Sequence, residues 1–365
     1  MKASTKVFWL SFHRWTGLVA GILIVLVGVT GSILIFEDEL DIWFNADLFS
    51  VEPLGNHAEL DLIITAAENE SPEWKAFFAS RLDDADERSF IVTLRHGNGD
   101  EKQIFVNPYS AEVTGTRSSL SSMALIRRFH GDLTLGAIGE NLLGVLAVLL
   151  MVMFLAALAI WWPSKGKATS ALTVKWTGDS RRVLRDLHNT SGVYLFLFLF
   201  LSALTVPPIV WKLTTPEAGP PAQPAAPSAG SSGALPRPAQ NAGPPPTIPW
   251  QQAADAALEA VPESWLGFIL RPLGPQPFYL IRVFPPGENA VAMQTTVFVN
   301  RYSGDIIRVS VPAAPAWTSL LSADFAASLH SGAIAGLPGR LIMFVVGLFF
   351  PALFVTGFIL WWRRK

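Results

Sequence analysis

The chain has 365 residues, of which half are hydrophobic and only 15% are charged, with a formal net charge of −2. This composition is typical of a membrane protein rather than a soluble one, and nothing in it indicates a nucleic-acid partner. There is no cysteine, which excludes disulfides, iron–sulfur clusters and thiolate-ligated or covalently attached haem. A protein of this composition that carries electrons must therefore use a non-covalent cofactor held mostly by histidine.

Four apolar runs are long enough to cross a hydrocarbon core of about 30 Å. They occupy residues 18–36, 142–162, 193–211 and 341–362. Lys and Arg gather before the first run, after the second and after the fourth, which places both termini and the middle loop in the cytoplasm by the positive-inside rule. We expect a multi-pass protein of a bacterial inner membrane, with the first run retained as an anchor in the lipid bilayer.

Residues 40–125, between the first two runs, are expected to form a small periplasmic α+β module. The pattern predicts one helix followed by two strands, at residues 60–69, 89–94 and 102–106. A Pro turn and a returning strand then follow. His57 and His96 lie in polar sequence and are expected to be ordinary surface residues.

The second half of the chain repeats this plan after an insertion. Residues 214–249, rich in Pro, Ala, Gly and Ser, are expected to be a disordered periplasmic linker. The pattern of residues 250–315 then predicts a second α+β module, with a helix and two strands at residues 251–261, 278–284 and 295–299. The segment F-V-N-R-Y-S-G-D of this module closely matches F-V-N-P-Y-S-A-E of the first. The chain is therefore an internal duplication, span–module–span written twice.

The expected fold class is an α-helical four-span membrane bundle with two periplasmic α+β modules. The cytoplasmic loop is too short for a nucleotide-binding domain and contains neither a G-x-G-x-x-G nor a P-loop pattern. In the first half of the chain we expect a lead with the first span (1–39), module one (40–125), an interfacial helix with the second span (126–162) and the cytoplasmic loop (163–187). In the second half we expect the third span (188–213), the linker (214–249), module two (250–315) and an interfacial helix with the fourth span (316–365).

Four of the six histidines lie at the edges of the spans. His13 and His188 lie at the cytoplasmic edge, and His130 and His330 lie at the periplasmic edge. Parallel repeats build sites at their interface, so a bundle would pair His13 with His188 and His130 with His330. Two facing imidazoles are what a six-coordinate b-type haem needs, and bundle interiors are where such cofactors are held. The pattern therefore favours two haem sites, one near each edge of the membrane.

The first span also carries a stripe of glycine on the face of its histidine, counting 100° per residue. Helix packing through small residues is a sufficient explanation for such a stripe on its own. Because a histidine precedes the glycines on the same face, we favour the interpretation that the stripe makes room for a flat cofactor ring. The stripe consists of Gly17, Gly21, Gly28 and Gly31.

The four histidines are also compatible with two different roles. Interfacial histidines can cap helices or meet headgroups, and a histidine pair can bind zinc or another transition metal. A zinc site is the weaker interpretation, because no carboxylate or second histidine stands three or four residues from any of the four. Several arginines lie near the right depth to hold haem propionates, although charge and anchoring rules also account for them. These are Arg14, Arg127, Arg128, Arg185 and Arg340.

The histidine motifs resemble those of the PepSY-associated transmembrane helix proteins. The motifs are H-R-W-T-G, R-F-H-G-D-L, L-H-N-T-S-G and S-L-H-S-G, and the resemblance covers almost the whole chain apart from the linker. It implies four spans, two periplasmic PepSY modules and two haems b held by the span histidines. The family includes inner-membrane ferric-siderophore reductases of the ferrioxamine B reductase type. The chain departs from the family pattern at Asn189, Ala111 and Arg301, which stand where Arg, Gly and Pro are usual.

These patterns lead to one-electron transfer across the membrane as the leading hypothesis. Electrons from quinol or a cytoplasmic reductase would reach the haem of His13 and His188, pass to that of His130 and His330, and reduce a ferric siderophore in the periplasm. Reduction weakens the hold of a hard oxygen-donor chelator on iron. The sequence indicates no catalytic residue.

Two alternatives come from other classes of protein. The first is a non-redox periplasmic binding or sensor scaffold in which the histidines are structural. The second is a transporter, which would need polar groups or broken helices at the bilayer midplane. Pro351 and Thr356 are the only hints of that kind in the spans.

Overall fold

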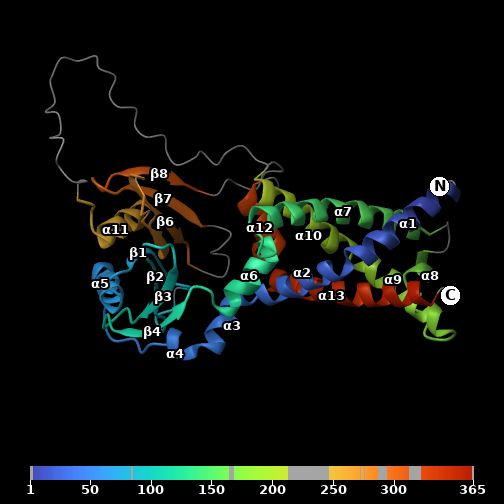
Figure 1. Ribbon diagram of the computed structural model, residues 1–365, viewed down its shortest axis with the longest axis horizontal. Helices are drawn as coiled ribbons and strands as arrows, with labels where there is room; N and C mark the ends of the chain where they lie inside the picture. The colour runs from blue at the N-terminus through green and yellow to red at the C-terminus, as the bar shows by residue number, and fades with distance from the viewer. Residues whose placement is uncertain are drawn as a thin grey trace, which may run out of the picture. The chain divides into compact units, whose positions relative to one another are not determined.

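The computed structural model describes residues 3–83, 85–163, 168–212, 246–271, 273–274, 276–286, 294–311 and 322–363. The expected linker falls almost entirely outside these described residues. The chain divides into a helical unit of residues 1–37, 122–214 and 314–365 and a sheet unit of residues 38–121 and 215–313. Both halves of the duplication thus contribute to both units, as the colours of Figure 1 show.

The helical unit contains the apolar segments of the chain. Two of its helices, Ala137–Trp161 and Ala333–Trp362, are long and apolar enough to cross a membrane, and the number rises to four if each of two bent helix pairs is one span. In chain order its helices are α1 (Ala3–Val19), α2 (Gly21–Leu34), α6 (Ser122–Asp132), α7 (Ala137–Trp161), α8 (Ala168–Ala171), α9 (Ser180–Tyr194), α10 (Phe196–Trp211), α12 (Ala323–Ser331), the 3-10 turn η3 (Ala333–Ala335) and α13 (Gly336–Trp362).

The first and third predicted spans are bent rather than straight. Helices α1 and α2 meet at 62° and helices α9 and α10 at 58°. Each break occupies one residue, Ala20 and Leu195, with backbone angles near φ −90° and ψ −10° to −4°, at the edge of the helical region. The two breaks stand 175 residues apart, the same offset that separates His13 from His188. Each break is therefore part of the repeat.

The short helices α6 and α12 end in tight turns that lead into α7 and α13. His130 lies in the last turn of α6, and His330 lies in the last turn of α12. A Cβ atom on Gly139 would lie 1.6 Å from the backbone oxygen of Asp132, and one on Gly339 would lie 2.1 Å from that of Gly332. Only glycine permits this approach, so the two glycines fix where each short helix ends against its long helix.

The helices of the two halves interleave. Helix α7 packs against α10, and α13 packs against α2, so each long helix lies beside the bent pair of the other half (Figure 1). Their common core includes Ile24, Leu150, Phe154, Leu199 and Val346. The repeat interface therefore runs through the middle of the unit, which is where parallel repeats place their sites.

The sheet unit consists of one eight-stranded antiparallel sheet in the order β4-β3-β2-β1-β5-β6-β7-β8. Its strands are β1 (Lys75–Ser80), β2 (Phe90–Arg95), β3 (Glu101–Val106), β4 (Val113–Ser118), β5 (Trp265–Leu270), β6 (Phe278–Phe284), β7 (Thr295–Asn300) and β8 (Ile306–Ser310). The two modules expected to be separate share this sheet, because β1 pairs with β5 across the repeat boundary with Ala79 opposite Ile269. We expected two separate modules, whereas the structure shows one duplicated domain.

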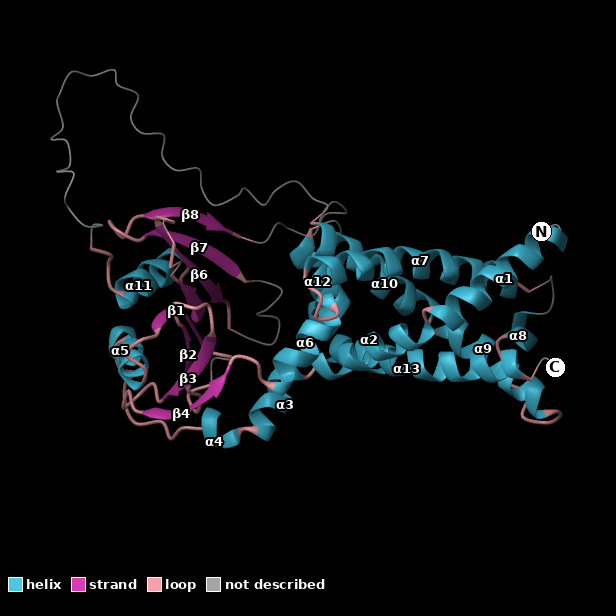
Figure 2. Ribbon diagram, in the orientation of Figure 1, coloured by secondary structure: helices cyan, strands magenta, loops and turns pink. Residues whose placement is uncertain are grey.

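Two helices, α5 (Leu60–Glu70) and α11 (Trp250–Ala260), lie on the same face of the sheet (Figure 2). They cap each other: the Asp61 carboxylate accepts the backbone N–H groups of Trp250 and Gln251 at 2.9 Å each. The Gln251 side chain in turn accepts the N–H of Leu60 at 2.7 Å. Because these are the unpaired N–H groups of helix starts, the reciprocal caps tie the two halves together. Two further short helices, α3 (Glu37–Phe44) and α4 (Ala46–Phe49), precede the sheet.

Most predicted elements of the sheet unit match the structure to within one residue, and the predicted strand at residues 278–284 has the bounds of β6. The central strands β1 and β5 were not predicted. The turn after β3 holds Ala111 at φ 56°, whereas its counterpart Gly304 has φ 82°. This turn requires a left-handed backbone conformation, which glycine adopts without strain. Ala111 adopts the same conformation with strain.

Candidate functional site

The structure brings the four span histidines together in the two pairs that the duplication predicts. The ring centres of His13 on α1 and His188 on α9 lie 6.3 Å apart, with their planes at 80°. The ring centres of His130 on α6 and His330 on α12 lie 6.2 Å apart, with their planes at 54°. All four rings come from different helices, so each pair forms only when both halves are folded.

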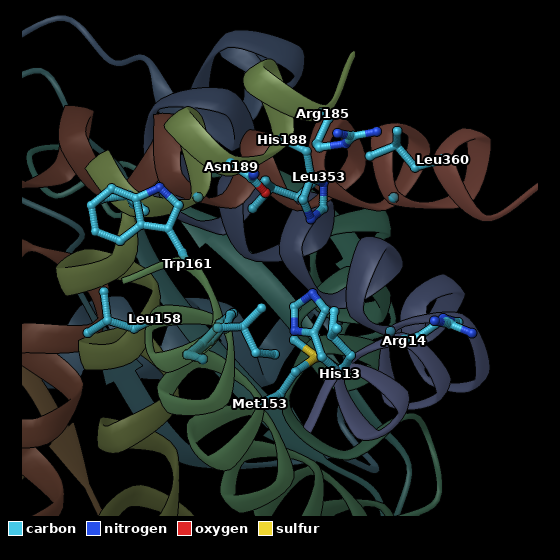
Figure 3. Close-up of a pocket in the computed structure, with 18 of the residues that line it drawn as sticks. His13, Arg14, Met153, Leu158, Trp161, Arg185, His188, Asn189, Leu353 and Leu360 are labelled. Carbon is cyan, nitrogen blue, oxygen red and sulfur yellow. The ribbon is translucent and has the colours of Figure 1, made fainter. Parts of the chain in front are cut away.

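Each pair lines a cavity. The cavity of His13 and His188 has a volume of about 930 Å³, and Figure 3 shows the two rings extending from separate helices towards the same space, with Met153 near His13 and Leu353 near His188. The cavity of His130 and His330 has a volume of about 330 Å³. Apolar side chains form most of both walls, which suits a largely apolar cofactor with a few fixed polar contacts.

The two cavities share part of their walls. Ile24 of α2 and Phe350 of α13 line both of them, and Phe350 packs against the core that contains Ile24. The two cavities therefore adjoin at Ile24 and Phe350, within one apolar core of the helical unit.

The glycine stripe predicted on the first span divides between these cavities. Gly17 lies on α1 before the break and lines the larger cavity, whereas Gly31 lies on α2 after it and lines the smaller one. A Cβ atom on Gly31 would lie 2.7 Å from Cε1 of His130. Gly21 and Gly28 accommodate the rings of Phe354 and Phe350. The stripe thus serves both helix packing and the placement of one histidine.

Threonine and backbone oxygens hold the Nδ1 atoms of His130 and His330. Nδ1 of His130 lies 2.9 Å from the Val27 oxygen and 3.3 Å from Thr30 Oγ1. Nδ1 of His330 lies 3.1 Å from the Ser202 oxygen and 2.8 Å from Thr205 Oγ1. The two sets are related by the repeat, since Thr30 and Thr205 stand 175 residues apart.

The direction of these hydrogen bonds follows from the threonines. Thr30 Oγ1 donates to the Leu26 oxygen at 2.8 Å, and Thr205 Oγ1 donates to the Leu201 oxygen at 3.0 Å. A hydroxyl has one proton, so each threonine accepts from the histidine, and a backbone oxygen can only accept. Each Nδ1 therefore carries the proton, and each Nε2 keeps its lone pair for a metal.

The same arrangement holds His188 in the larger cavity. Its Nδ1 lies 2.9 Å from Thr356 Oγ1, which donates its own proton to the Ala352 oxygen at 2.8 Å. Nδ1 of His13 is buried and makes no hydrogen bond to any described residue. Thr356, which the sequence suggested only as a weak sign of a transporter, is thus a support for a candidate ligand.

The predicted arginine contacts separate into two groups. Arg14 and Arg185 line the larger cavity, as Figure 3 shows, and so remain placed to meet a carboxylate there. Arg127 pairs with Glu37, and Arg340 donates to the Ile35 oxygen with its guanidinium 4.8 Å from the Phe36 ring centre. Arg128 is exposed, and none of these last three lines the smaller cavity.

The other two histidines lie apart from both cavities, in the sheet unit. His57 is exposed and packs against Tyr109 with ring centres 4.8 Å apart. His96 is half-buried beside Trp74 and lies 3.8 Å from the Glu73 carboxylate. Desolvation and the charge of Arg81 lower the pKa of His57, which favours its neutral form. Neither His57 nor His96 lines either of the two cavities described above.

The residues of both cavities fit a haem. A metal–imidazole bond of about 2 Å on each side, added to the half-widths of two rings, puts the ring centres of two axial histidines about 6 Å apart, which matches both pairs. Among the described residues no group of three or more His, Cys, Asp and Glu side chains could hold an ion. A zinc ion would want three or four protein ligands, whereas a haem supplies the other four nitrogens itself.

The family model described as the PepSY-associated TM region matches residues 10–364, nearly the whole chain. No curated protein matches the chain significantly. The matched region contains all four histidines of the two cavities and both halves of the duplication.

Proposed function

We propose, from the premise that this chain belongs to the family of the PepSY-associated TM region, that it is a membrane electron-transfer protein with two bis-histidine haems b. The observation that carries the proposal is the pair of cavities, each with two histidines at the spacing of axial ligands. At least three of the four present a bare Nε2, because their Nδ1 protons are held elsewhere. A histidine with a purely structural role would not need a second histidine facing its Nε2.

The chain's residues would hold and orient the cofactors. His13 and His188 would bind one haem from the first helix of each bent pair, and His130 and His330 would bind the other from two short helices. Bound haem supplies one-electron oxidation and reduction. The walls of both cavities are mostly apolar, and Ile24 and Phe350 line both of them. No proton has to cross between the sites, so the spans need no carboxylate relay.

Topology gives this arrangement a direction. With each bent pair counted as one span there are four spans, and the positive-inside rule applied to the Lys and Arg of the flanks would then put both termini in the cytoplasm. The pair of His13 and His188 would lie at the entry side, where quinol or a cytoplasmic reductase supplies electrons. The pair of His130 and His330 would lie at the periplasmic side, and a ferric siderophore, which the family resemblance suggests, would be the acceptor.

The helix breaks, which a transporter would also use, have a structural role in this function. Residues on both sides of each break line the larger cavity, including Gly17 and Gly21 around one break and Gly192 and Phe196 around the other. Both breaks are therefore flanked by residues in the wall of the cavity that contains His13 and His188.

A spectrum of the full-length protein tests this proposal. We expect a reduced-minus-oxidised spectrum with b-type bands, a pyridine haemochrome count of two haems per chain, and re-oxidation of the dithionite-reduced protein by a ferric hydroxamate or catecholate chelate. Ferrozine added with the chelate would report release of Fe(II). Absence of haem after expression with haem precursor would overturn the proposal and favour a binding scaffold. Two haems without re-oxidation would overturn only the ferric acceptor.

Gly31, which lies next to the ring of His130, leads to a second prediction. Gly31→Val would place a branched side chain where even a Cβ atom comes 2.7 Å from the ring, so the ring must tilt from the direction of its partner. Loss of ligand orientation typically costs ten- to a hundred-fold in metal affinity. We expect haem affinity at His130 and His330 to fall at least about tenfold, measured by haem titration of the depleted protein.

The matched control is Gly17→Val, on the same predicted span. No atom lies within 4 Å of a Cβ built on Gly17, so this variant should keep the haem between His130 and His330. Equal loss of that haem in both variants would show that the effect comes from helix packing and not from the ring of His130.

A further inference from the structure

The surroundings of the four histidines follow the repeat except at one position. Thr30 and Thr205 are repeat mates and hold His130 and His330. Thr356 of α13 holds His188. Its mate, 200 residues earlier on α7, is Ala156, which has no hydroxyl. His13 therefore lacks the partner that the other three histidines have.

The missing hydroxyl leaves His13 the least supported ring. Its Nδ1 is buried without a hydrogen bond to any described residue, although the Met153 backbone lies on that side, as the Leu353 backbone does for His188. A hydrogen bond at Nδ1 fixes the orientation of a ligating histidine and makes its other nitrogen a stronger ligand. A ring without that bond is a weaker ligand and turns more freely.

The space beside His13 is open. A Cβ atom on Gly17, a turn after His13, would meet nothing within 4 Å, and one on its repeat mate Gly192 would meet a side-chain atom of Leu353 at 3.9 Å. The cavity itself measures about 930 Å³, against about 330 Å³ for that of the other pair. His13 thus has room to swing aside, and a small molecule has room to enter.

We propose that His13 is the exchangeable ligand of the four, and that a small uncharged ligand of diatomic size binds in its place beside His188. This inference rests on the proposed function, because it needs a haem between the two rings. Ligand binding there would stop electrons at the pair where they enter. His188, His130 and His330 keep their places because a threonine holds each of them.

Carbon monoxide is the probe that tests the exchange. The full-length protein, loaded with two haems and reduced with dithionite, is titrated with carbon monoxide and followed by its absorption spectrum. We expect one of the two haems to form the complex. Ala156→Thr supplies the missing hydroxyl and should weaken carbon monoxide binding at least about tenfold, and Ala156→Ser tests the same hydroxyl with a smaller side chain.

Thr205→Ala is the converse variant, because it removes the hydroxyl from His330 of the other pair. We expect it to let the second haem bind carbon monoxide as well. The inference is overturned if the wild-type protein with two haems binds none, if both haems bind alike, or if neither Ala156 variant changes the affinity. A protein without haem overturns the proposed function and this inference with it, so the haem count separates the two failures.

Discussion

Replacing His188 with Ala is expected to remove one of the two haems and to leave the other with an unchanged spectrum. The reason is that His188 and His13 face each other across one cavity, with ring centres 6.3 Å apart, so a haem there loses one axial bond. The measurement is the haem count per chain together with a redox titration, which should fall from two components to one. His330→Ala should remove the other component.

The pairing itself is tested by comparing single variants. His13→Ala and His188→Ala should affect the same component, because both side chains line the larger cavity. His57→Ala is the control, because His57 is exposed in the sheet unit and should leave both haems in place. Loss of different components in His13→Ala and His188→Ala would contradict the pairing and the path through the two cavities.

Replacing Arg117 with Ala is expected to destabilise the outer strands of the sheet unit by about 3–5 kcal/mol, the usual cost of leaving a buried charge without its partner. Arg117 binds Asp41 through two hydrogen bonds of 2.7 Å each, and only 16% and 12% of the two side chains is exposed. Its guanidinium also lies 5.0 Å from the ring centre of Phe105. The variant would leave the Asp41 carboxylate with the Asn45 amide but without its cationic partner, beside an apolar cluster.

Hydrogen exchange of the full-length protein measures this effect locally. Amides of β3 and β4 should exchange about a hundred to a few thousand times faster, since each 1.36 kcal/mol corresponds to a factor of ten. Arg95→Ala is the matched control, because its partner Glu101 lies in the same sheet but 39% and 33% of the two side chains is exposed. Such a pair contributes about 1 kcal/mol or less. Similar exchange in both variants would show that burial of the pair does not matter.

The repeat made much of this protein readable from its sequence. One offset aligned His13 with His188 and another aligned His130 with His330, and in the structure the ring centres of those pairs lie 6.3 and 6.2 Å apart. Apolar runs and alternating strands gave most element bounds, since hydrophobic periodicity depends on local sequence. The family resemblance agrees with the match over residues 10–364. Haem, the donor and the ferric acceptor stay predictions.

Some features could not be predicted because they depend on partners far along the chain. The strands β1 and β5 carry Ala76, Ala79 and Gly267 instead of clear alternation, and only their pairing with each other shows that the two modules are one sheet. Arg127 and Arg340 were predicted to contact haem propionates from their depth alone. In the structure Arg127 forms an ion pair with Glu37, and Arg340 donates a hydrogen bond to the Ile35 oxygen.

The sequence by itself determined the apolar segments, the duplication and the four histidines, because these depend on residue type and spacing. Only the tertiary structure decided which oxygen holds each Nδ1, because Thr205 lies 125 residues from His330 and Thr356 lies 168 from His188. It also decided that Nδ1 of His13 is buried without a hydrogen bond to any described residue. A hydrogen bond acts over about 3 Å, so it exists only once packing has brought its two groups together.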